Sequence, residues 1–232
     1  YNKFKESITV AVDESRKQGI LELMGQNNNP NVIVLDDAFQ HRKVKAGFYI
    51  LLTTYGKLYS NDIVLPTGNL REPRTGAKRA DVIIVTKCPK SISQQEKQEI
   101  RSKLKPLSNQ HLFFSSINYS DEVFAFNKVK KLVDLQNVTL ITGIANPIPL
   151  VEYIEASGIG FKHLKFNDHH NFTETEINSF EKLECILTTE KDYMRLKAYE
   201  SLKNKLYYIP IDVVIKESDS FNKIVETYLK SY

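Results

Sequence analysis

The sequence predicts an α/β fold in which mostly parallel sheets are covered by helices. Short β-branched runs have the length of buried strands, other segments have the apolar spacing of helices, and the two kinds alternate along the chain. Strands are expected at residues 7–12, 32–35, 48–54, 81–86, 111–117, 138–144, 161–166, 185–188 and 206–213. Helices are expected at residues 15–24, 93–104, 150–156, 174–183 and 220–229. Alternation of this kind places helices on the faces of parallel sheets.

Local signals mark the ends of two of these helices. Gly158 follows the helix expected at residues 150–156, at the position where helices commonly end on a glycine. Thr173 and Glu176 have the spacing of a capping box, which predicts that the next helix begins between them.

A polar stretch at residues 118–135 predicts a boundary between two domains. Residues 1–117 are expected to be the remainder of a nucleotide-binding α/β domain, and residues 118–213 a smaller α/β domain with connector strands. The apolar runs at residues 111–117 and 206–213 flank the smaller domain and are expected to pair as that connector. Residues 214–232 are expected to form a C-terminal helix that returns to the first domain.

Composition limits the classes of partner. The chain has 232 residues, of which 41% are hydrophobic and 26% charged, and this is typical of a globular protein. A net charge of +4 is too small to indicate nucleic acid, but it is compatible with an anionic substrate. No apolar run approaches the roughly 20 residues that span a bilayer. Cys88 and Cys185 lie on or beside apolar strands and are expected to be small buried residues rather than a disulfide.

Asp36 and Asp37 directly follow the apolar run at residues 32–35, which predicts that they end a buried strand. Sheets of the α/β class bind ligands outside this end of their strands. Neighbouring carboxylates there suit Mg²⁺, which usually presents a nucleotide phosphate for transfer. A turn with two solvated acids is the alternative, because aspartate is common in turns. From this pair alone, both interpretations remain open.

The segment LPTGNLREP at residues 65–73 predicts a shaped loop, because its prolines and glycine exclude regular structure. Arg71 suits phosphate through its planar fork of donors, and Glu72 could ligate a metal or orient Arg71. A surface salt bridge is the simpler interpretation of this spacing. Basic residues are concentrated near these loops, at Arg42, Lys43, Lys45, Arg71, Arg74, Lys78 and Arg79.

Other candidates have two open interpretations each. His41 lies four residues after Asp37, so on a helix it would orient Asp37 or touch a phosphate; otherwise it is a partly buried histidine bonded to backbone. Lys87 follows the strand expected at residues 81–86 and could lie along a nucleotide, although an ordinary exposed lysine is slightly favoured. Lys191 and Asp192 form either a structural ion pair or part of a closing site.

Asp168, His169 and His170 are the most distinctive cluster of the second domain. Adjacent histidines suggest zinc, but only one acid is next to them and no third ligand has a usual spacing, so zinc is not expected. The alternative without a catalytic or binding role is a pair of surface histidines before the N-terminus of a helix.

Six motifs follow one another along the chain: DDAFQHR at residues 36–42, LPTGNLREP at 65–73, RADVIIVTK at 79–87, ITGIANP at 141–147, FNDHHNFT at 166–173 and TEKD at 189–192. Taken in this order, they resemble the motifs of the tetraacyldisaccharide 4'-kinases, the lipid A 4'-kinases of Gram-negative bacteria. Ala38 replaces the family's usual glycine, and Asn167 replaces a usual proline.

The resemblance implies a P-loop-kinase-like sheet, incomplete here, plus a smaller α/β domain joined by a two-stranded connector. No G-x-x-x-x-G-K-[ST] loop occurs in the sequence, whereas the family carries that loop and its catalytic base before the paired aspartates. The chain therefore resembles the C-terminal two-thirds of the enzyme, and this segment alone is expected to be inactive.

The implied function is an ATP-dependent kinase acting on the 4'-hydroxyl of a tetraacyldisaccharide 1-phosphate, with ATP and Mg²⁺ as cofactors. Its partners would be ATP, an anionic glycolipid and the cytoplasmic face of the bacterial inner membrane, reached through the part outside this sequence, with no nucleic acid. The alternatives are another P-loop small-molecule kinase or ligase, and a non-catalytic nucleotide-binding regulator.

The resemblance also implies roles for individual residues. Asp36, Asp37 and Glu72 are expected to hold Mg²⁺, and the two aspartates to be catalytic. His169 is expected to be catalytic by supporting the base, although the sequence does not decide between it and His170. Phosphate or substrate is expected to be bound by Arg71, His41, Arg42 and Lys87.

Overall fold

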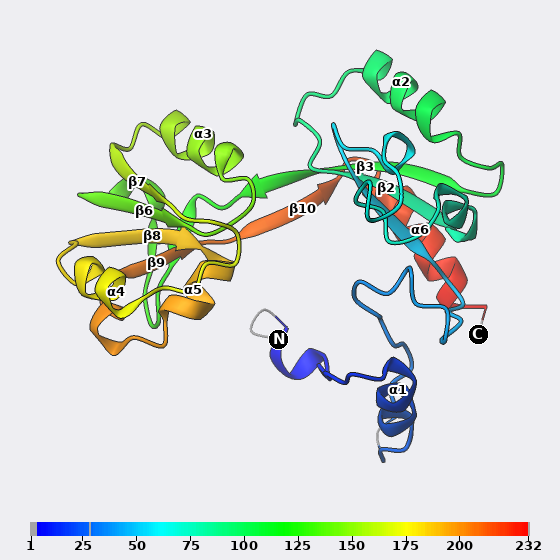
Figure 1. Ribbon diagram of the computed structural model, residues 1–232, viewed down its shortest axis with the longest axis horizontal. Helices are drawn as coiled ribbons and strands as arrows, with labels where there is room; N and C mark the ends of the chain where they lie inside the picture. The colour runs from blue at the N-terminus through cyan, green and yellow to red at the C-terminus, as the bar shows by residue number, and fades with distance from the viewer. Residues whose placement is uncertain (1–3, 28, 232) are drawn as a thin grey trace. The chain divides into compact units, whose positions relative to one another are not determined.

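The computed structural model describes residues 4–27 and 29–231 and contains two compact units (Figure 1). Unit 1 is formed by Tyr1–Ser116 and Ile215–Tyr232, and unit 2 by Ile117–Val214. The helices are α1 (Arg16–Met24), α2 (Gln94–Leu104), α3 (Ile148–Ala156), α4 (Glu174–Phe180), α5 (Glu190–Leu196) and α6 (Ser218–Leu229). Short 3₁₀ helices occur at Lys5–Ser7, Tyr59–Asn61, Arg74–Arg79, Leu132–Asp134 and Glu200–Leu202.

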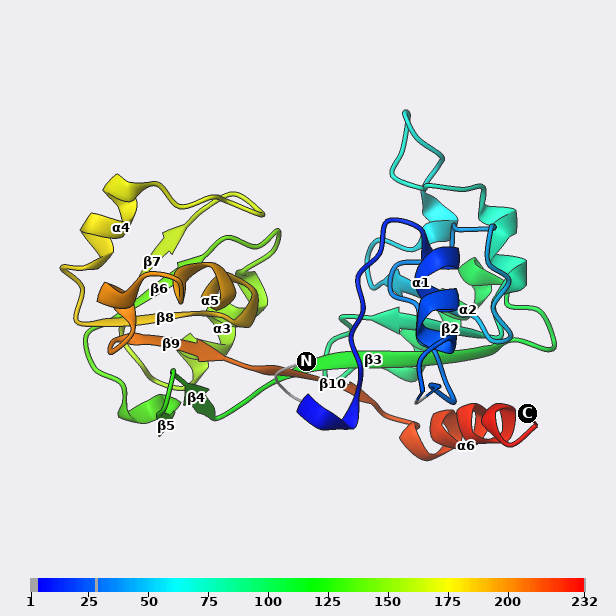
Figure 2. The same cartoon turned by 90° about the horizontal axis from the view of Figure 1, so that it is seen from below.

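A four-stranded sheet has the order β1-β2-β3-β10, with β1, β2 and β3 parallel; β1, β2 and most of β3 belong to unit 1, and β10 lies mostly within the residues of unit 2. These strands are β1 (Ile50–Thr54), β2 (Val82–Thr86), β3 (His111–Tyr119) and β10 (Ile211–Ile215). The central strand β2 is buried on both faces, as a continuous β-branched run predicts. Helix α2 packs through Ile100 and Leu104 on one face, and α6 packs through Phe221 and Ile224 on the other (Figure 2).

Unit 2 contains a six-stranded sheet in the order β5-β4-β9-β8-β6-β7. Its strands are β4 (Glu122–Phe124), β5 (Val129–Lys131), β6 (Val138–Thr142), β7 (Phe161–Lys165), β8 (Cys185–Thr189) and β9 (Leu206–Ile209). The last four strands are parallel, and β4 and β5 form an antiparallel edge. Leu140 faces a core closed by α3, whereas its neighbour Ile141 faces the core of α4 and α5, so helices cover both faces (Figure 1).

The predicted fold class is confirmed, because both units are helices packed on mostly parallel sheets. β3 and β10 are neighbours in one sheet, as the connector required. Gly158 has a φ of 79° just after α3, and Thr173 and Glu176 form the predicted capping box at α4. Both cysteines are buried and unpaired.

Two predicted strands are wrong. Residues 7–12 and 32–35 lie outside the strands of the structure, and the side chains of Val12 and Val34 are 97% and 88% exposed. Strand propensity is realised only where a neighbouring strand accepts the backbone hydrogen bonds. Within the described part of the chain, neither segment has such a neighbour. Asp36 and Asp37 therefore do not end a buried strand.

Three smaller differences follow from local chemistry. The run expected at residues 206–213 is broken at Pro210, which has no N–H to donate, and becomes β9 and β10. The polar stretch at residues 118–135 is not a linker but contains β4, β5 and a 3₁₀ helix. Helix α5 was not expected, and it begins at the TEKD motif, where the side chain of Thr189 accepts from the backbone N–H of Asp192.

The carboxylate of Glu96, at the start of α2, provides a test of this fold. Glu96 accepts from the backbone N–H and hydroxyl of Ser93 (2.9 and 2.7 Å) and from the hydroxyl of Tyr55 (2.7 Å), and the hydrogen bonds to Ser93 lower its pKa from 4.5 to about 2. A carboxylate whose pKa falls on folding stabilises the protein above its unfolded pKa, and this contribution is lost as the pH falls toward 2. Glu96→Gln should therefore lower the unfolding midpoint at pH 7, with a gap to the wild type that narrows below pH 4.5. A gap that stays constant to pH 3, or an equal effect of Glu99→Gln on the same helix, would contradict this account.

Candidate functional site

The loop that contains Asp36 and Asp37 is held in shape by its own hydrogen bonds. Asp37 has a φ of 44°, a left-handed conformation that aspartate adopts more readily than most residues. The backbone N–H of His41 donates to the carbonyl of Ala38 (2.9 Å), and the side-chain amide of Gln40 donates to the carbonyl of Asp37 (3.0 Å). The turn interpretation of this motif is thus correct for the backbone, and it leaves both carboxylates exposed.

The second motif loop is organised by Asp62. Its carboxylate accepts from the backbone N–H of Ile63 (2.8 Å) and from the backbone N–H and side-chain amide of Asn69 (3.2 and 3.0 Å). These hydrogen bonds, the one from the Asn69 amide first, hold the pKa of Asp62 below its usual value. The loop is therefore closed over residues 62–69, and Arg71 and Glu72 follow directly after it.

Ion pairs join the two motif loops. Arg71 Nη1 lies 2.7 Å from Asp37 Oδ2, and Arg42 Nη2 lies 3.2 Å from Glu72 Oε2. The hydrogen bond from Arg71 holds the pKa of Asp37 below its usual value. The side chains of Arg71 and Asp37 are 60% and 65% exposed, so their pair is worth little stability, but it brings both motif residues to one place.

Glu72 is the centre of this cluster. Arg79 donates to both of its carboxylate oxygens (2.8 and 3.1 Å) and also to the carbonyl of Phe39 (2.7 Å), while its guanidinium lies 4.6 Å above the Phe39 ring. The Glu72 side chain is only 17% exposed. Burial alone raises the pKa of Glu72, but hydrogen bonds from Arg79 and Arg42 outweigh it and the pKa lies below its usual value. Arg79 and Glu72 therefore fasten the first motif loop to the second.

The donor set fits Mg²⁺ only in part. Among residues 4–27 and 29–231, no group of three histidine, cysteine or acidic side chains is placed to hold a metal. The Glu72 carboxylate is occupied by two guanidinium groups, so its geometry supports an anchoring role rather than the expected metal ligation. Asp36 and Asp37 retain exposed carboxylate oxygens. Mg²⁺ is commonly bound by only one or two carboxylates together with substrate phosphates, and this pair suits that mode.

The remaining candidates of unit 1 lie outside the ion-pair cluster. Arg16, which was not a predicted site residue, donates weakly to the carbonyls of Asp36 and Asp37 (3.4 Å each). His41 has an exposed side chain and contributes its backbone N–H to the turn. The helix on which it could have shared a face with Asp37, one of its two open interpretations, does not form. Lys87 directly follows β2 with a φ of 58° and is exposed.

In unit 2, His169 is held by its backbone and flanked by two cations. It has a φ of 59°, and its N–H donates to the carbonyl of Gly143 (3.2 Å). Its ring atom Nε2 lies 3.1 Å from Lys191 Nζ, and Nδ1 lies 3.1 Å from Arg195 Nη2. Lys191 is also paired with Asp168 (3.1 Å), which holds the pKa of that carboxyl below its usual value. The His169 side chain is 68% exposed.

Asp192 is the buried anchor of the cluster formed by Asp168, His169, Lys191 and Arg195. Its side chain is fully buried and accepts from the backbone N–H of Gly143 (2.9 Å) and the hydroxyl of Thr189 (2.8 Å). A Cβ atom on Gly143 would lie 3.0 Å from the Asp192 carboxylate, so the close approach suits glycine. Asp192 therefore joins the end of β6 to the start of α5, and Arg195 adds an ion pair at 3.4 Å.

His170 has a different, structural environment. Its Nε2 lies 3.0 Å from a carboxylate oxygen of Glu176, the same residue that caps α4. Its ring stacks on Phe166 (4.8 Å between centroids) and contacts Phe172 edge-on (5.2 Å). Of the two adjacent histidines, His169 is thus the one available to a substrate or to another reacting group.

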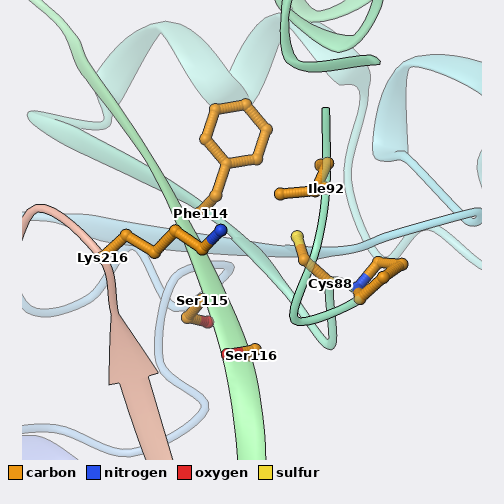
Figure 3. A pocket seen from close by; sticks show the side chains of 7 residues that line it. Cys88, Ile92, Phe114, Ser115, Ser116 and Lys216 are labelled. Atoms are coloured by element: carbon orange, nitrogen blue, oxygen red, sulfur yellow. The ribbon is translucent and has the colours of Figure 1, made fainter. Parts of the chain in front are cut away.

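A small cavity in unit 1 is not part of either cluster. Cys88, Ile92, Phe114 and Lys216 surround it, as Figure 3 shows, and the space between them is too narrow to hold a water molecule. Burial raises the pKa of the Cys88 thiol to about 11, so it is inert at neutral pH.

Sequence reasoning missed two roles. Arg79 was counted only among the basic residues, because its bond to Glu72 depends on how two loops fold. Arg195 was not singled out, although its position three residues after Asp192 would have placed both on one face of α5 had that helix been predicted.

The α/β fold and arginine-rich loops of this chain are typical of proteins that bind phosphate groups. Comparison with known proteins identifies the family: the family model described as tetraacyldisaccharide-1-P 4'-kinase matches residues 2–230. The chain belongs to the tetraacyldisaccharide-1-P 4'-kinase family. The predicted family is confirmed, and with it the predicted class of phosphotransferase with an alcohol acceptor.

Similar proteins support this assignment. A tetraacyldisaccharide 4'-kinase from Flavobacterium johnsoniae is 44% identical over 99% of this chain and 68% of its own length. One from Bacteroides fragilis is 39% identical over 99% of this chain and 67% of its own length. The chain thus spans about two thirds of the length of these relatives. This is the extent that was predicted from the resemblance together with the absence of a phosphate-binding loop in the sequence.

A solved structure shares the fold. The crystal structure of the "apo" form of LpxK from Aquifex aeolicus in complex with ATP superposes with a TM-score of 0.64 at 24% identity, covering 92% of this chain and 62% of that one. In the described part of this chain, no helix is both long and apolar enough to cross a membrane.

The packing around Glu72 can be tested at Gly76. A Cβ atom there would lie 2.7 Å from the Glu72 carboxyl carbon, so Glu72 must shift and loosen its bonds to Arg79 and Arg42. Gly76→Ala should lower the free energy of unfolding by about 1–3 kcal/mol, the usual cost of overpacking. Gly160→Ala is the control, because no atom lies within 4 Å of a Cβ atom built there. Equal stability of the two variants in denaturant unfolding would show that the Glu72 cluster tolerates the extra methyl group.

Proposed function

We propose that the full-length protein transfers the γ-phosphoryl group of ATP to the 4'-hydroxyl of a tetraacyldisaccharide 1-phosphate. The observation that carries this proposal is the contact between the two motif loops of unit 1, where Arg71 and Asp37 meet at 2.7 Å. Family membership supplies the reaction class and favours the kinase over another small-molecule kinase or a non-catalytic regulator.

Asp36 and Asp37 would hold Mg²⁺ together with the phosphates of ATP. Bound there, the metal supplies neutralisation of the charge on the transferring group. The two carboxylates are exposed on a turn whose backbone is fixed by local hydrogen bonds, so their oxygens are positioned without being buried. In this proposal Glu72 keeps the loops in place through its arginines rather than ligating the metal.

Arg71 would stabilise phosphate charge by exchanging partners. Its present pair with Asp37 is exposed, and exposed ion pairs contribute only about 0–1 kcal/mol. A phosphate oxygen array offers the same planar guanidinium two parallel hydrogen bonds. Arg42 is also exposed and lies at the same cluster, so it would bind the anionic substrate with Arg71, while His41 and Lys87 would contribute from outside it.

His169 would support the catalytic base, which the family resemblance places outside these 232 residues. Its exposure and its fixed backbone suit a group that meets a partner from elsewhere in the enzyme. The glycolipid substrate implies that the full-length enzyme works peripherally at the cytoplasmic face of the inner membrane. That attachment is expected through a part of the protein not included in this sequence.

Replacement of Asp37 tests the metal and phosphate site. In the full-length enzyme, Asp37→Ala should lower kcat by at least ~10²-fold, the scale of losing electrostatic stabilisation of the transferring group. Asp134→Ala removes another exposed acid outside both clusters and should leave kcat unchanged. Near-normal turnover of the Asp37 variant at saturating ATP and Mg²⁺ would rule out the assignment.

Replacement of His169 tests the proposed support of the base. A positioned acid–base group contributes about 10²–10⁴-fold, so His169→Ala should lose kcat on that scale with little change in the KM for ATP. His111→Ala, at an exposed histidine outside the cluster, is the matched control. Retained kcat with weakened ATP binding, or zinc bound at this position, would show that His169 has another role.

A further inference from the structure

Arg195 links the exposed ring of His169 to the buried carboxylate of Asp192. One guanidinium nitrogen lies 3.1 Å from His169 Nδ1, and the other lies 3.4 Å from Asp192 Oδ1 and 3.4 Å from the carbonyl of His170. Arg195 is 25% exposed and Asp192 is fully buried. Because Asp192 is fixed by Gly143 and Thr189, the arginine is anchored on the side away from His169.

On the opposite side of the imidazole, the neighbour of His169 is Lys191, whose side chain is long and flexible. Lys191 Nζ lies 3.1 Å from Nε2, but it also lies 3.1 Å from Asp168 Oδ1, which can take it up alone. A neutral imidazole has one acceptor nitrogen, so it accepts from only one of these two cations at a time. Arg195 has the planar, anchored donor and Lys191 the flexible one. The geometry therefore favours acceptance at Nδ1 and a proton on Nε2.

We propose that Arg195 is a positioning residue for His169: it fixes the ring orientation and the Nε2–H tautomer through its anchor on Asp192. This inference rests on the proposed role of His169. An Nε2–H group can donate a hydrogen bond to a carboxylate that acts as the base, whereas the other tautomer would present a lone pair to that carboxylate. The charged groups that face the ring are Asp168, Lys191 and Arg195, and of these only Arg195 is tied to a fully buried group.

Removal of Arg195 leaves the Asp192 carboxylate with hydrogen-bond donors but without its paired cation. Asp192 still accepts from the backbone N–H of Gly143 and from the hydroxyl of Thr189, so its buried carboxylate keeps two donors. Arg195→Met is expected to lower the free energy of unfolding, because the buried Asp192 charge loses its cation. Stability is therefore measured beside kcat, and Arg195→Lys, which keeps the positive charge, is the variant that separates orientation of His169 from folding.

The experiment is a double-mutant cycle in the full-length enzyme with the variants Arg195→Met, His169→Ala and the pair. Arg195→Met should lower kcat about 10–100-fold, the scale of removing a group that orients a reactive side chain, with the KM for ATP nearly unchanged. In the His169→Ala background, the same substitution should cost almost nothing, because both changes interrupt one unit. Lys197→Met, which removes an exposed cation from the end of the same helix, should leave kcat at the wild-type value.

Two further measurements separate orientation from folding. Arg195→Lys should recover part of kcat, because a lysine donates to the ring but cannot span both partners. Nitrogen-15 NMR of the His169 ring should show Nε2 protonated in the wild type and in Lys197→Met, and a mixture of tautomers in Arg195→Met. If Arg195→Met lowers the unfolding temperature so far that kinetics are not comparable, Arg195→Lys and the NMR spectra decide the question.

The outcomes distinguish this inference from the proposed function. Full kcat in His169→Ala removes the role of His169 itself, whatever Arg195 does. Loss of kcat in His169→Ala, together with wild-type kcat in Arg195→Met, overturns only the inference. The same holds if Arg195→Met costs an equal factor in both backgrounds, or if the ring tautomer is unchanged in that variant.

Discussion

The carboxylate of Glu72 is the contact on which the arrangement of unit 1 depends. It receives Arg79 and Arg42, and Arg79 in turn holds the carbonyl and ring of Phe39. Neither motif loop contains regular secondary structure up to residue 73, so no sheet or helix hydrogen bonds fix one against the other. A partly buried carboxylate with its oxygens occupied is strongly bound in place, because leaving such a charge unpaired costs several kcal/mol. Loss of Glu72 would therefore remove the carboxylate that Arg79 and Arg42 share, and with it the most buried contact between the two loops.

Unit 2 uses the same physical device with a different set of donors. Asp192 is fully buried and is satisfied by a backbone N–H, a hydroxyl and a guanidinium from three neighbouring segments. In each unit a carboxylate with little exposure, Glu72 or Asp192, has several hydrogen-bond partners. The ion pairs next to them, Arg71 with Asp37 and Lys191 with Asp168, are exposed. Exposed pairs are weak and exchange partners readily. This division leaves the anchored groups to set the geometry and the exposed groups to bind a charged ligand.

The sequence was a good guide wherever burial alone decides the structure. The runs at β2 and β6 are rich in β-branched residues and formed strands buried on both faces, and the capping box at Thr173 started α4 where it was expected. It failed at residues 7–12 and 32–35, whose β-branched side chains have strand propensity but no strand neighbour in the described part of the chain. The role of Glu72 as a metal ligand stays a prediction. The sequence could not show that two arginines contact its carboxylate, because they come from positions 30 residues before and 7 residues after it. Pairings set by loop folding leave no periodic trace in a sequence.

In three motifs, two adjacent polar residues have different roles: one anchors the backbone through its hydrogen bonds, and the other is more exposed to solvent. Arg71 is 60% exposed and Glu72 17%, His169 is 68% exposed and His170 26%, and Lys191 is 44% exposed and Asp192 fully buried. Neighbouring side chains on a turn or at a helix start point in different directions, so one can anchor while the next faces solvent. The less exposed member of each pair is bonded within its own unit: Glu72 to Arg79, His170 to Glu176, Asp192 to Gly143. The exposed member therefore has its backbone position fixed one residue away from a rigid contact, which is the condition for a reactive side chain to be oriented without being buried.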